Sequence, residues 1–436
     1  MSEKKKERRA PGTGTVFQDK SSGLWTARLD AINPATGDVE SQKVRTKTKE
    51  DAEAALELML DKRARGQQLT TTNMRLGEWL DLWLEKYTKA RTPRGKEAQE
   101  GNIRRYIKPA IGNVRLRSLT IEDVESVHTL IEGKLNKAGK PLSSSTARQA
   151  HVVLRGALKE AKRRKLITEN VADDVDLPLS DSVEIPSLSG KEARTLLRAT
   201  ADDRLAARWG LGLLALRQGE ALGVRLSSVH LEKKYAYIEV ASQLQRIPWK
   251  HGCGPERRDG TFECGHKRGA ECPGKHIDAR RGWQHERIGD TGLYLSAPKS
   301  RHGVRSVPLV EPFRSLVADR MDAAAGEPNS YGLLLTQPPK KIQHREEWKP
   351  LDGSPINPAA DWRAFQAITE AAGLPKVSIH SLRHSTVELL YKLEVPEKTI
   401  QEIAGHSVVG TTRKYTKLDR ATQDRAARKL GKMLGG

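Results

Sequence analysis

The fold of the C-terminal third is decided by two runs of sequence, His380-Ser381-Leu382-Arg383-His384 and Gly405-His406-Ser407-Val408-Val409-Gly410-Thr411-Thr412-Arg413-Lys414-Tyr415-Thr416. Because His380 and Arg383 are three residues apart, a helix would place both side chains on one face. Gly405 is typical of the residue that ends a helix, which would hold His406 at a helix terminus. Tyr415 follows on another predicted short helix. Basic and titratable side chains are therefore expected on ordered elements in this region.

Two upstream segments add an arginine and a lysine. The stretch 211–231, LGLLALRQGEALGVRLSSVHL, predicts an apolar helix that is interrupted by Arg217 and Glu220 and followed by a turn and a strand. A charged arginine in such a run must be paired or must face an anion, and Glu220 alone could pair with it. Residues 293–297 and 305–309 predict the two strands of a hairpin, with Lys299 beside its turn. Taken alone, a hairpin lysine indicates only a solvated edge charge.

Together these segments resemble the tyrosine recombinases, and among them the phage-type integrases of mobile elements. The resemblance rests on five boxes in the order of that family: ALRQGE around Arg217, PKSRHGVRSVPL around Lys299, HSLRH, GHSVVGTT and RKYT. Five boxes in one order are not expected by chance. None of the catalytic positions of the family is substituted in this sequence.

The resemblance implies a role for each matching residue. Tyr415 would attack a DNA phosphodiester, leaving a 3′-phosphotyrosyl bond and a free 5′-hydroxyl. Arg217 and Arg383 would clamp the non-bridging phosphate oxygens, whose charge grows in the transition state, and bidentate guanidinium donors suit that task.

The remaining three residues would bind phosphate and move protons. By the same resemblance, His406 would hydrogen-bond the phosphate, His380 would assist proton transfer near the tyrosine oxygen, and Lys299 would protonate the departing 5′-oxygen. A phenol with a pKa near 10 is a poor nucleophile at neutral pH, so it needs cationic neighbours and a proton acceptor. Two arginines, one lysine and two histidines supply both without a metal.

The phosphotyrosine conserves the energy of the cleaved bond, in keeping with the absence of a G-x-x-x-x-G-K-[ST] loop for ATP from the sequence.

One segment departs from the family, which usually has a short loop where this chain has Pro248–Asp290. It contains all the cysteines of the chain, Cys253, Cys264 and Cys272. They stand among glycine, proline and charged residues that cannot build a core, which favours metal binding. The prediction is a Cys₃His zinc site with His276 as the fourth ligand and His266 as the alternative. Because the spacing contains no C-x₂-C pair, a reduced loop without metal stays open as a competing interpretation.

The N-terminal part predicts two DNA-binding modules. Between Gly12 and Val44, short β-like runs separated by turn residues predict a three-stranded antiparallel sheet, and Thr48 or its neighbour would cap a helix that reaches about Arg65. Four basic residues of this module suit DNA phosphates: Lys43, Arg45, Lys47 and Lys49. A stabilising appendage is the alternative interpretation of this module.

From Met74 to about Asp176 the pattern is helical, with apolar residues at helical spacing and further helices expected at 97–107, 120–136 and 143–165. The last of these helices ends in a basic patch that favours phosphate contact, formed mainly by Lys162, Arg163, Arg164 and Lys165.

The fold class expected is therefore multidomain: a small three-stranded β-sheet plus helix at the N-terminus, an all-α core-binding domain, and a mainly α (α+β) tyrosine recombinase catalytic domain. The expected boundaries are a basic disordered tail at 1–11, an arm-type DNA-binding domain at 12–70, the core-binding domain at 74–178, and the catalytic domain at 186–436 with its insertion at about 248–290.

Composition agrees with a polyanionic partner. Lysine and arginine number 76 against 55 aspartates and glutamates, a formal charge of +21, which favours nucleic acid before an anionic membrane surface. No apolar stretch approaches the roughly 18 residues needed to span a bilayer, and the basic N-terminus lacks the apolar region of a secretory signal. The expected location is the cytoplasm, at the nucleoid when the protein is bound to DNA.

The predicted function is a site-specific integrase that integrates or excises a phage or other mobile element. Its expected partners are double-stranded DNA with core-type and arm-type attachment sites and a homo-tetramer on that DNA, with an excision factor and a host DNA-bending protein as further candidates and no membrane. Catalysis would require no cofactor. The predicted helix at 419–434 would dock on a neighbouring subunit or cap its own domain.

Two alternative functions remain. A non-catalytic DNA-binding or architectural protein of the same fold would need no nucleophile, so the complete catalytic set argues against it. A type IB topoisomerase-like enzyme would relax one duplex by the same chemistry. Relaxation has no need to hold two classes of site, so the N-terminal module argues against this alternative.

Overall fold

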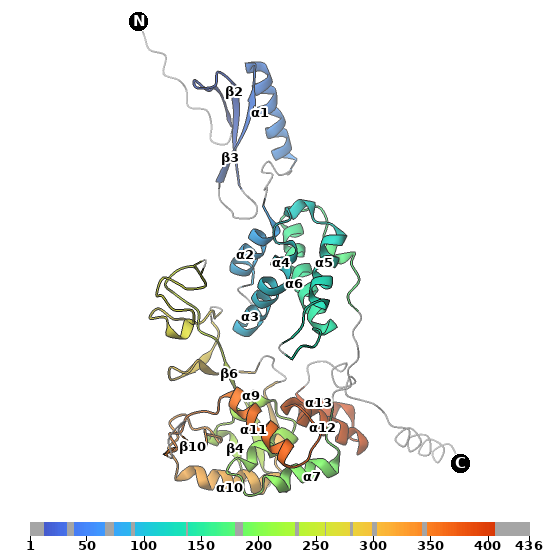
Figure 1. The fold of residues 1–436 in the computed structure, drawn as a ribbon, viewed down its shortest axis with the longest axis vertical. Coiled ribbons are helices and arrows are strands. Elements are labelled where there is room, and N and C mark those ends of the chain that lie inside the picture. Colours follow the sequence, from blue (N-terminus) through green and yellow to red (C-terminus); the bar gives the residue numbers. More distant parts are fainter. Residues whose placement is uncertain are drawn as a thin grey trace, which may run out of the picture. The chain divides into compact units, whose positions relative to one another are not determined.

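The computed structural model describes residues 13–32, 39–65, 74–88, 92–136, 138–178, 186–231, 235–257, 259–279, 282–298, 303–341 and 347–405. The chain divides near residue 182 into two compact units. The first holds a small sheet with one helix and a group of helices, and the second holds small sheets among helices (Figure 1).

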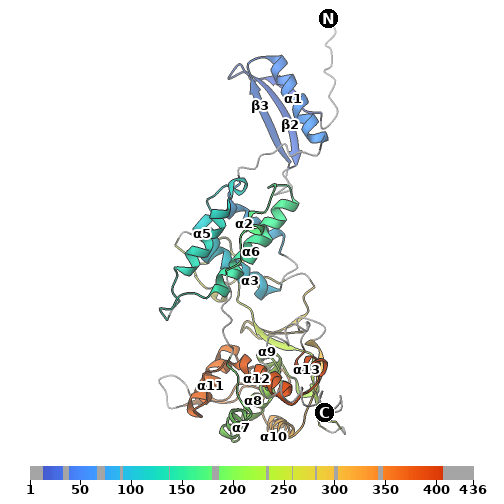
Figure 2. The ribbon, with the colours of Figure 1, turned by 90° about the vertical axis from the view of Figure 1, so that its right-hand side faces the viewer.

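The N-terminal sheet has the predicted three antiparallel strands. Its elements are β1 (Thr15–Gln18), β2 (Trp25–Ile32), β3 (Val39–Thr46) and α1 (Lys49–Ala64), in the sheet order β1-β2-β3. Thr48 caps α1, because its hydroxyl accepts a hydrogen bond from the backbone N–H of Asp51 at 3.1 Å. Ala27 and Leu29 of β2 are buried against Leu56 of α1, so α1 covers one face of the sheet, as Figure 2 shows.

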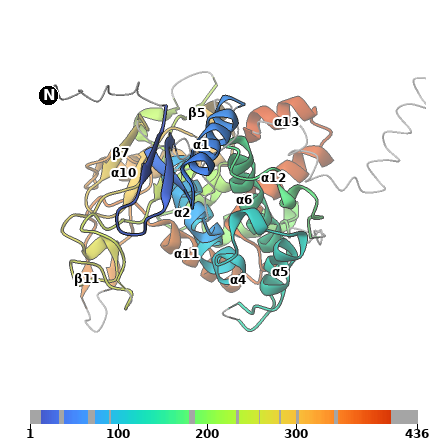
Figure 3. The same cartoon turned by 90° about the horizontal axis from the view of Figure 1, so that it is seen from above.

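The helical region packs around the apolar stripe that the periodicity predicted. Its helices are α2 (Leu76–Lys86), α3 (Pro93–Asn102), the π-helical turn Ile103–Ile107, α4 (Lys108–Ile111), α5 (Ile121–Glu132) and α6 (Ser144–Arg163). Trp79 and Leu80 are fully buried in this core, and the indole N–H of Trp79 donates to the carbonyl of Ala157 at 3.0 Å. Helices α5 and α6 lie side by side (Figures 1 and 3). The helix expected at 97–107 is longer at both ends, since Thr92 caps α3 and α4 continues it.

A buried histidine pair joins α5 to α6. The imidazoles of His128 and His151 lie 3.2 Å apart between Nε2 and Nδ1. Burial lowers the pKa of His128, and burial together with the charge of His128 lowers the pKa of His151. A lowered histidine pKa makes the unfolded chain bind more protons than the native chain below the ordinary value near 6.5, so stability is lost as the pH falls below that value.

We therefore expect amide hydrogen exchange in α5 and α6 to be faster at pH 5.5 than at pH 7.5, after correction for the intrinsic exchange rate. His128→Leu should flatten this pH dependence because it removes one of the two titrating groups. An exchange profile with the same pH dependence in wild type and variant would contradict the assignment.

The second unit combines helices with two three-stranded sheets and one two-stranded ribbon among its described residues. Its helices are α7 (Gly190–Ala199), α8 (Ala206–Leu213), α9 (Gln218–Leu222), α10 (Phe313–Ala325), α11 (Pro358–Ala371), α12 (Ile379–Lys392) and α13 (Glu397–Ala404). Its strands are β4 (Val229–His230), β5 (Tyr237–Val240), β6 (Gln243–Arg246), β7 (His285–Ile288), β8 (Leu293–Ser296), β9 (Arg305–Pro308), β10 (Lys340–Lys341) and β11 (Trp348–Lys349). The sheet orders are β4-β5-β9, β6-β8-β7 and β10-β11.

The predicted hairpin around Lys299 is wrong. Strands β8 and β9 do not pair with each other, because β8 lies between β6 and β7 while β9 pairs with β5. All four residues of β8 are buried, so this strand is the centre of a sheet and its two neighbours already use its hydrogen-bonding edges. Strands β8 and β9, which flank Lys299 in the sequence, therefore belong to different sheets.

Within the described residues, no helix is both long enough and apolar enough to cross a membrane.

Candidate active site

Arg217 lies at a break between two helices. Helix α8 ends at Leu213, Ala215 takes a left-handed backbone conformation with φ of 64°, and Arg217 is the residue that precedes α9. The single helix predicted from Leu211 onward is thus wrong. The break keeps Ala215 and Leu216 buried while the Arg217 side chain stays 40% exposed, which a continuous apolar helix would not allow.

Glu220 joins Arg217 to a second arginine, Arg305. One carboxylate oxygen of Glu220 lies 2.6 Å from Arg217 Nη1, and the other lies 3.1 Å from Arg305 Nη2. The backbone N–H of Arg217 also donates to this carboxylate at 2.9 Å. Burial of Glu220 opposes its ionisation, but the charges of Arg305 and Arg217 outweigh burial and lower the pKa of the carboxyl below its usual value. Glu220 is therefore an anion held between two cations.

Arg305 ties three of the family boxes together. Its Nε donates to the carbonyl of Ile403 at 2.8 Å, and its Nη1 donates to the carbonyl of Gly303 at 3.2 Å. Arg217 Nη2 donates to the carbonyl of Gly405 at 3.1 Å, at the left-handed residue that ends α13. The end of α13, the segment beside β9 and the Arg217 break are therefore linked by charged hydrogen bonds.

Helix α12 brings the second predicted arginine to the same break. The Arg383 side chain is buried, and its Nη1 donates to the carbonyl of Ala215 at 2.6 Å. Ser378 caps the helix, since its hydroxyl accepts from the backbone N–H of Ser381 at 3.1 Å. Arg383 therefore contacts the break between α8 and α9 that also holds Arg217, although the two arginines are far apart in the sequence.

His380 lies on the same helix. Desolvation, followed by the charges of Arg383 and Arg217, lowers the pKa of its imidazole. Its ring lies 4.6 Å from that of the buried His384, whose pKa falls to about 4 through burial and the charges of His380 and Arg383. Both histidines are therefore neutral at neutral pH, and His380 can accept a proton there.

Three of the six predicted catalytic residues, Lys299, His406 and Tyr415, lie outside the described residues. The predicted helix at 419–434 lies outside them as well. The predicted short helix that Gly405 ends is present as α13, with Gly405 at φ of 64°.

The sequence reasoning missed two groups that support Arg217. Arg305 stood unrecognised within the PKSRHGVRSVPL box. The second group is a buried ion pair between Arg208 and Asp361, with both N–O distances at 2.8 Å. Gln218, the neighbour of Arg217, donates to the same aspartate at 2.8 Å. A charged residue inside the apolar run of α8 was the available signal for this pair.

Arg305→Gln is expected to slow DNA cleavage by about 10²-fold, the scale of a misplacement of about 1 Å in a catalytic group. The variant keeps a polar side chain but loses the charge that Glu220 requires. The exposed Arg314, which donates to the carbonyl of Leu231, offers the control Arg314→Gln. Equal cleavage rates for both variants on one DNA substrate would show that Arg305 does not position the site.

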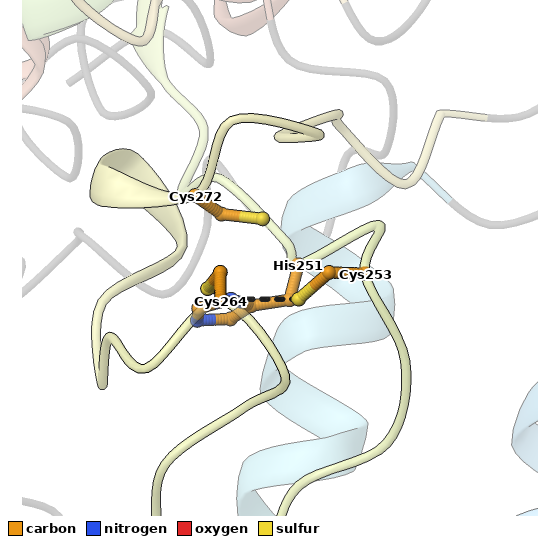
Figure 4. Close-up of side chains that lie close together, drawn as sticks. All are labelled: His251, Cys253, Cys264 and Cys272. Atoms are coloured by element: carbon orange, nitrogen blue, oxygen red, sulfur yellow. Dashed lines mark hydrogen bonds between the residues drawn. The ribbon is translucent and has the colours of Figure 1, made fainter.

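The structure gathers the three thiols around a different histidine from the one predicted. One candidate ligand atom from each of His251, Cys253, Cys264 and Cys272 lies within 4.8 Å of all the others, and Figure 4 shows the four side chains converging. His276 is not among the side chains of this cluster, although its main chain pairs with Lys250, the residue before His251. His266, the alternative ligand, is exposed and lies 3.7 Å from Glu271.

Seven of the eight predicted DNA-contact residues are exposed, and the eighth is half-buried. Lys43, Arg45, Lys47 and Lys49 are all exposed, and so are Lys162, Arg163 and Lys165, whereas Arg164 is half-buried. Several of these charges are already paired within the protein: Lys49 with Glu53 at 3.1 Å, and Arg163 and Arg164 with Glu160 at 2.8 Å.

Two family profiles match segments of this chain. The profile described as "Phage integrase family" matches residues 286–422, and the profile "Phage integrase, N-terminal SAM-like domain" matches residues 75–128. The first match includes the residues around Arg305, Arg383 and Gly405, and the second lies in the helical region.

Curated relatives extend over most of the chain. An integrase of Saccharopolyspora erythraea is 26% identical over 439 residues, covering 95% of this chain and 94% of that protein. A XerC-like tyrosine recombinase of Caldanaerobacter subterraneus subsp. tengcongensis is 23% identical, covering 84% of this chain and 85% of that protein.

Solved structures show the same fold. The Tn1549 transposon integrase in complex with transposon right end DNA aligns with a TM-score of 0.59 and 18% identity, over 82% of this chain and 100% of that one. A lambda integrase tetramer bound to a Holliday junction aligns with a TM-score of 0.50 and 14% identity, over 94% of this chain and 97% of that one. Residues 75–128 and 286–422 therefore carry phage integrase family domains in the order of that family, and most of the chain is similar to integrases and tyrosine recombinases.

Proposed function

We propose that this tyrosine recombinase is a site-specific integrase that cleaves and rejoins DNA at paired attachment sites through a 3′-phosphotyrosyl intermediate. The observation that carries the proposal is the convergence of Arg217, Arg383 and His380 at the α8–α9 break, held by the Glu220–Arg305 pair. Two guanidinium groups and a neutral imidazole form a site for a phosphodiester and for the proton of an attacking hydroxyl.

In this mechanism Tyr415 attacks phosphorus, the Tyr415 O–P bond forms, and the P–O5′ bond breaks. Arg217 and Arg383 stabilise the non-bridging oxygens, and His406 binds the same phosphate. His380 accepts the tyrosine proton, which suits the lowered pKa of its imidazole. Lys299 gives a proton to the leaving 5′-oxygen. The reverse reaction with a different 5′-hydroxyl joins the exchanged strands, so no cofactor and no ATP enter the chemistry.

The remaining functional assignments are part of the proposal. We assign the basic tail to 1–11, arm-site binding to 12–70, core-site binding to 74–178 and catalysis to 186–436. The lambda integrase forms a tetramer on a Holliday junction, and we propose the same assembly here, with the segment 419–434 docking on a neighbouring subunit. Action on chromosomal and element DNA would take place in the cytoplasm, at the nucleoid. An excision factor and a host DNA-bending protein are candidate partners.

The sheet offers an exposed basic face for arm-site DNA. In the register of β2 and β3, Lys43 stands opposite Arg28 and Arg45 stands opposite Thr26. These pairs alternate with the Ala27 and Leu29 positions that face α1, so they lie on the face of the sheet that α1 does not cover. A sheet face of this kind can enter a DNA groove.

The end of α6 offers a second contact, in the core-binding domain. Lys162 and Lys165 are both exposed. Replacing both by glutamine is expected to weaken binding to all DNA sequences alike and to reduce the slope of log affinity against log salt concentration by about 2, roughly one unit for each phosphate contact. The double variant Lys191→Gln/Lys376→Gln, at two exposed lysines outside the predicted DNA contacts, serves as the control. An unchanged salt slope in the double variant would exclude these lysines as phosphate contacts.

The Pro248–Asp290 insertion is proposed to hold one structural zinc ion. Three thiols and one imidazole form a closed ligand set of the kind that structural zinc sites use. The ion would take no part in bond breaking.

Strand exchange is the test of the proposed function. Wild-type protein would be incubated with supercoiled plasmids that carry pairs of segments tiled across the DNA flanking its gene. Recombinant products with SDS-resistant protein–DNA adducts would support an integrase. Relaxation without recombination for every pair would favour the topoisomerase-like alternative, and specific binding without adducts would favour the non-catalytic alternative.

A further inference from the structure

We infer that one zinc ion, bound by His251, Cys253, Cys264 and Cys272, fixes the strand that leads to Lys299 and so controls protonation of the leaving 5′-oxygen. The inference rests on the proposed role of Lys299 as general acid. It assigns the fourth ligand to His251 and gives the insertion a regulatory connection to the catalytic site.

The donor atoms are already close to a metal-binding arrangement. His251 Nδ1 lies 3.4 Å from Cys264 Sγ and 3.9 Å from Cys253 Sγ. In a tetrahedral zinc site with Zn–S bonds of about 2.3 Å, neighbouring donor atoms lie roughly 3.8 Å apart. The His251 ring stacks on Phe262 with a centroid distance of 3.6 Å and an interplanar angle of 5°, which fixes its orientation.

Apolar burial contributes little to holding the described part of the insertion in shape. Between Pro248 and Gln284, Cys272 is the single buried residue among those that the structure describes. The backbone nevertheless crosses itself closely around the cluster: a Cβ at Gly252 would lie 2.2 Å from the carbonyl oxygen of Gly274, and a Cβ at Gly269 would lie 2.1 Å from that of Trp249. Because a segment of this length cannot fold on so little apolar burial, metal binding would supply its folding free energy.

The cluster is connected to the Lys299 strand at both ends. The insertion leaves from β6 and returns through β7, and both strands pair with β8: Gln243 and His285 each stand opposite Ser296. Ser296 precedes Lys299 by three residues. A change in the conformation of the insertion would therefore affect both hydrogen-bonded edges of β8, the strand that precedes Lys299 in the sequence.

Trp249 forms a direct link between the ligand loop and this sheet. Its carbonyl lies beside Gly269 in the ligand loop, and its ring lies 6.1 Å from that of Tyr294 in β8. The guanidinium of Arg287, from β7, lies 4.6 Å from the centroid of the same indole ring. Loss of the ion would release this packing and loosen the contacts of β8, the strand that precedes Lys299 in the sequence.

Zinc content tests the ligand set without reference to activity. We expect about one zinc ion per chain in wild-type protein and in the controls His276→Ala and His266→Ala, since these histidines lie outside the cluster. His251→Ala and Cys264→Ser should lose most of the bound zinc. Wild-type protein without zinc, or variants with undiminished zinc, would overturn the site.

A change of leaving group tests the connection to Lys299. Cleavage would be compared on a suicide substrate with an ordinary 5′-oxygen and on one with a 5′-bridging sulfur, which departs without a proton. We expect Cys264→Ser to cleave the oxygen substrate about 10²-fold more slowly than wild type and the sulfur substrate nearly as fast. Site binding, measured in parallel, should be unchanged and shows that the variant is folded.

Equal losses on both substrates would overturn the connection, even with the zinc site intact. Loss of site binding by Cys264→Ser would also overturn it, because the ion would then support the whole fold. A wild-type protein that forms no adduct with either substrate would instead contradict the proposed recombinase function, so the two failures are distinct.

Discussion

Replacing Tyr415 with phenylalanine is expected to abolish the covalent protein–DNA adduct while leaving DNA binding intact. Phenylalanine keeps the aromatic ring and its packing but lacks the oxygen that forms the bond to phosphorus. Without that oxygen no phosphotyrosyl bond can form, so the loss should reach the detection limit of the assay, beyond the 10²–10⁴-fold effect of removing a general acid or base.

The measurement is an SDS-resistant adduct on nicked suicide duplexes, in which the cleaved strand loses the fragment needed for religation. Tyr235→Phe is the matched control, because Tyr235 is 76% exposed in the same unit and lies outside the five boxes. An adduct formed by Tyr415→Phe at the wild-type rate would assign the nucleophile to another residue.

The second large effect is expected for Glu220→Gln. The carboxylate holds Arg217 and the buried Arg305, whose side chain is 7% exposed. Removing one partner of a buried ion pair leaves an uncompensated charge and costs about 3–5 kcal/mol of stability. Most of this cost comes from Arg305, since Arg217 is partly exposed and screened by solvent.

The same change should reduce cleavage by at least about 10²-fold, because Arg217 loses the partner that orients its guanidinium toward the phosphate. Thermal unfolding and single-turnover cleavage below the unfolding transition separate the two effects. Glu239→Gln is the control, since the Glu239 side chain is 52% exposed on β5. Cleavage at the wild-type rate by folded Glu220→Gln protein would show that Arg217 is oriented by other contacts.

The sequence was sufficient to locate the chemistry. Charged and aromatic residues in five ordered boxes identified the family before any contact was known, and the alternation in the N-terminal part and the helical spacing after Met74 predicted the sheet and helices that the structure contains. These signals are local. Backbone conformation and the face of an element on which a residue lies depend mainly on its neighbours within a few residues.

The tertiary structure alone decided which residues support the site. Arg217 contacts Gly405 across 188 residues, and Arg305 contacts Ile403 across 98 residues. The spacing of apolar residues along the sequence does not indicate which distant residues come into contact. The role of Arg305 and the break at Ala215 could therefore not be predicted from it. The pairing of β8 with β6 and β7 was likewise hidden, because a buried strand and one arm of a hairpin have the same local pattern.

The group of three cysteines and one histidine shows the same division. Three cysteines confined to one segment that cannot build a hydrophobic core predicted a zinc site, because cysteine and histidine are the usual ligands of zinc in proteins. The sequence offered His276 as the fourth residue of this site with His266 as the alternative, whereas the structure places His251 beside the thiols. Sequence by itself therefore determined the residue types and the local elements of this protein. The partner of each functional side chain was decided only by tertiary packing, because a contact depends on distance in space and distant segments of the chain set that distance together.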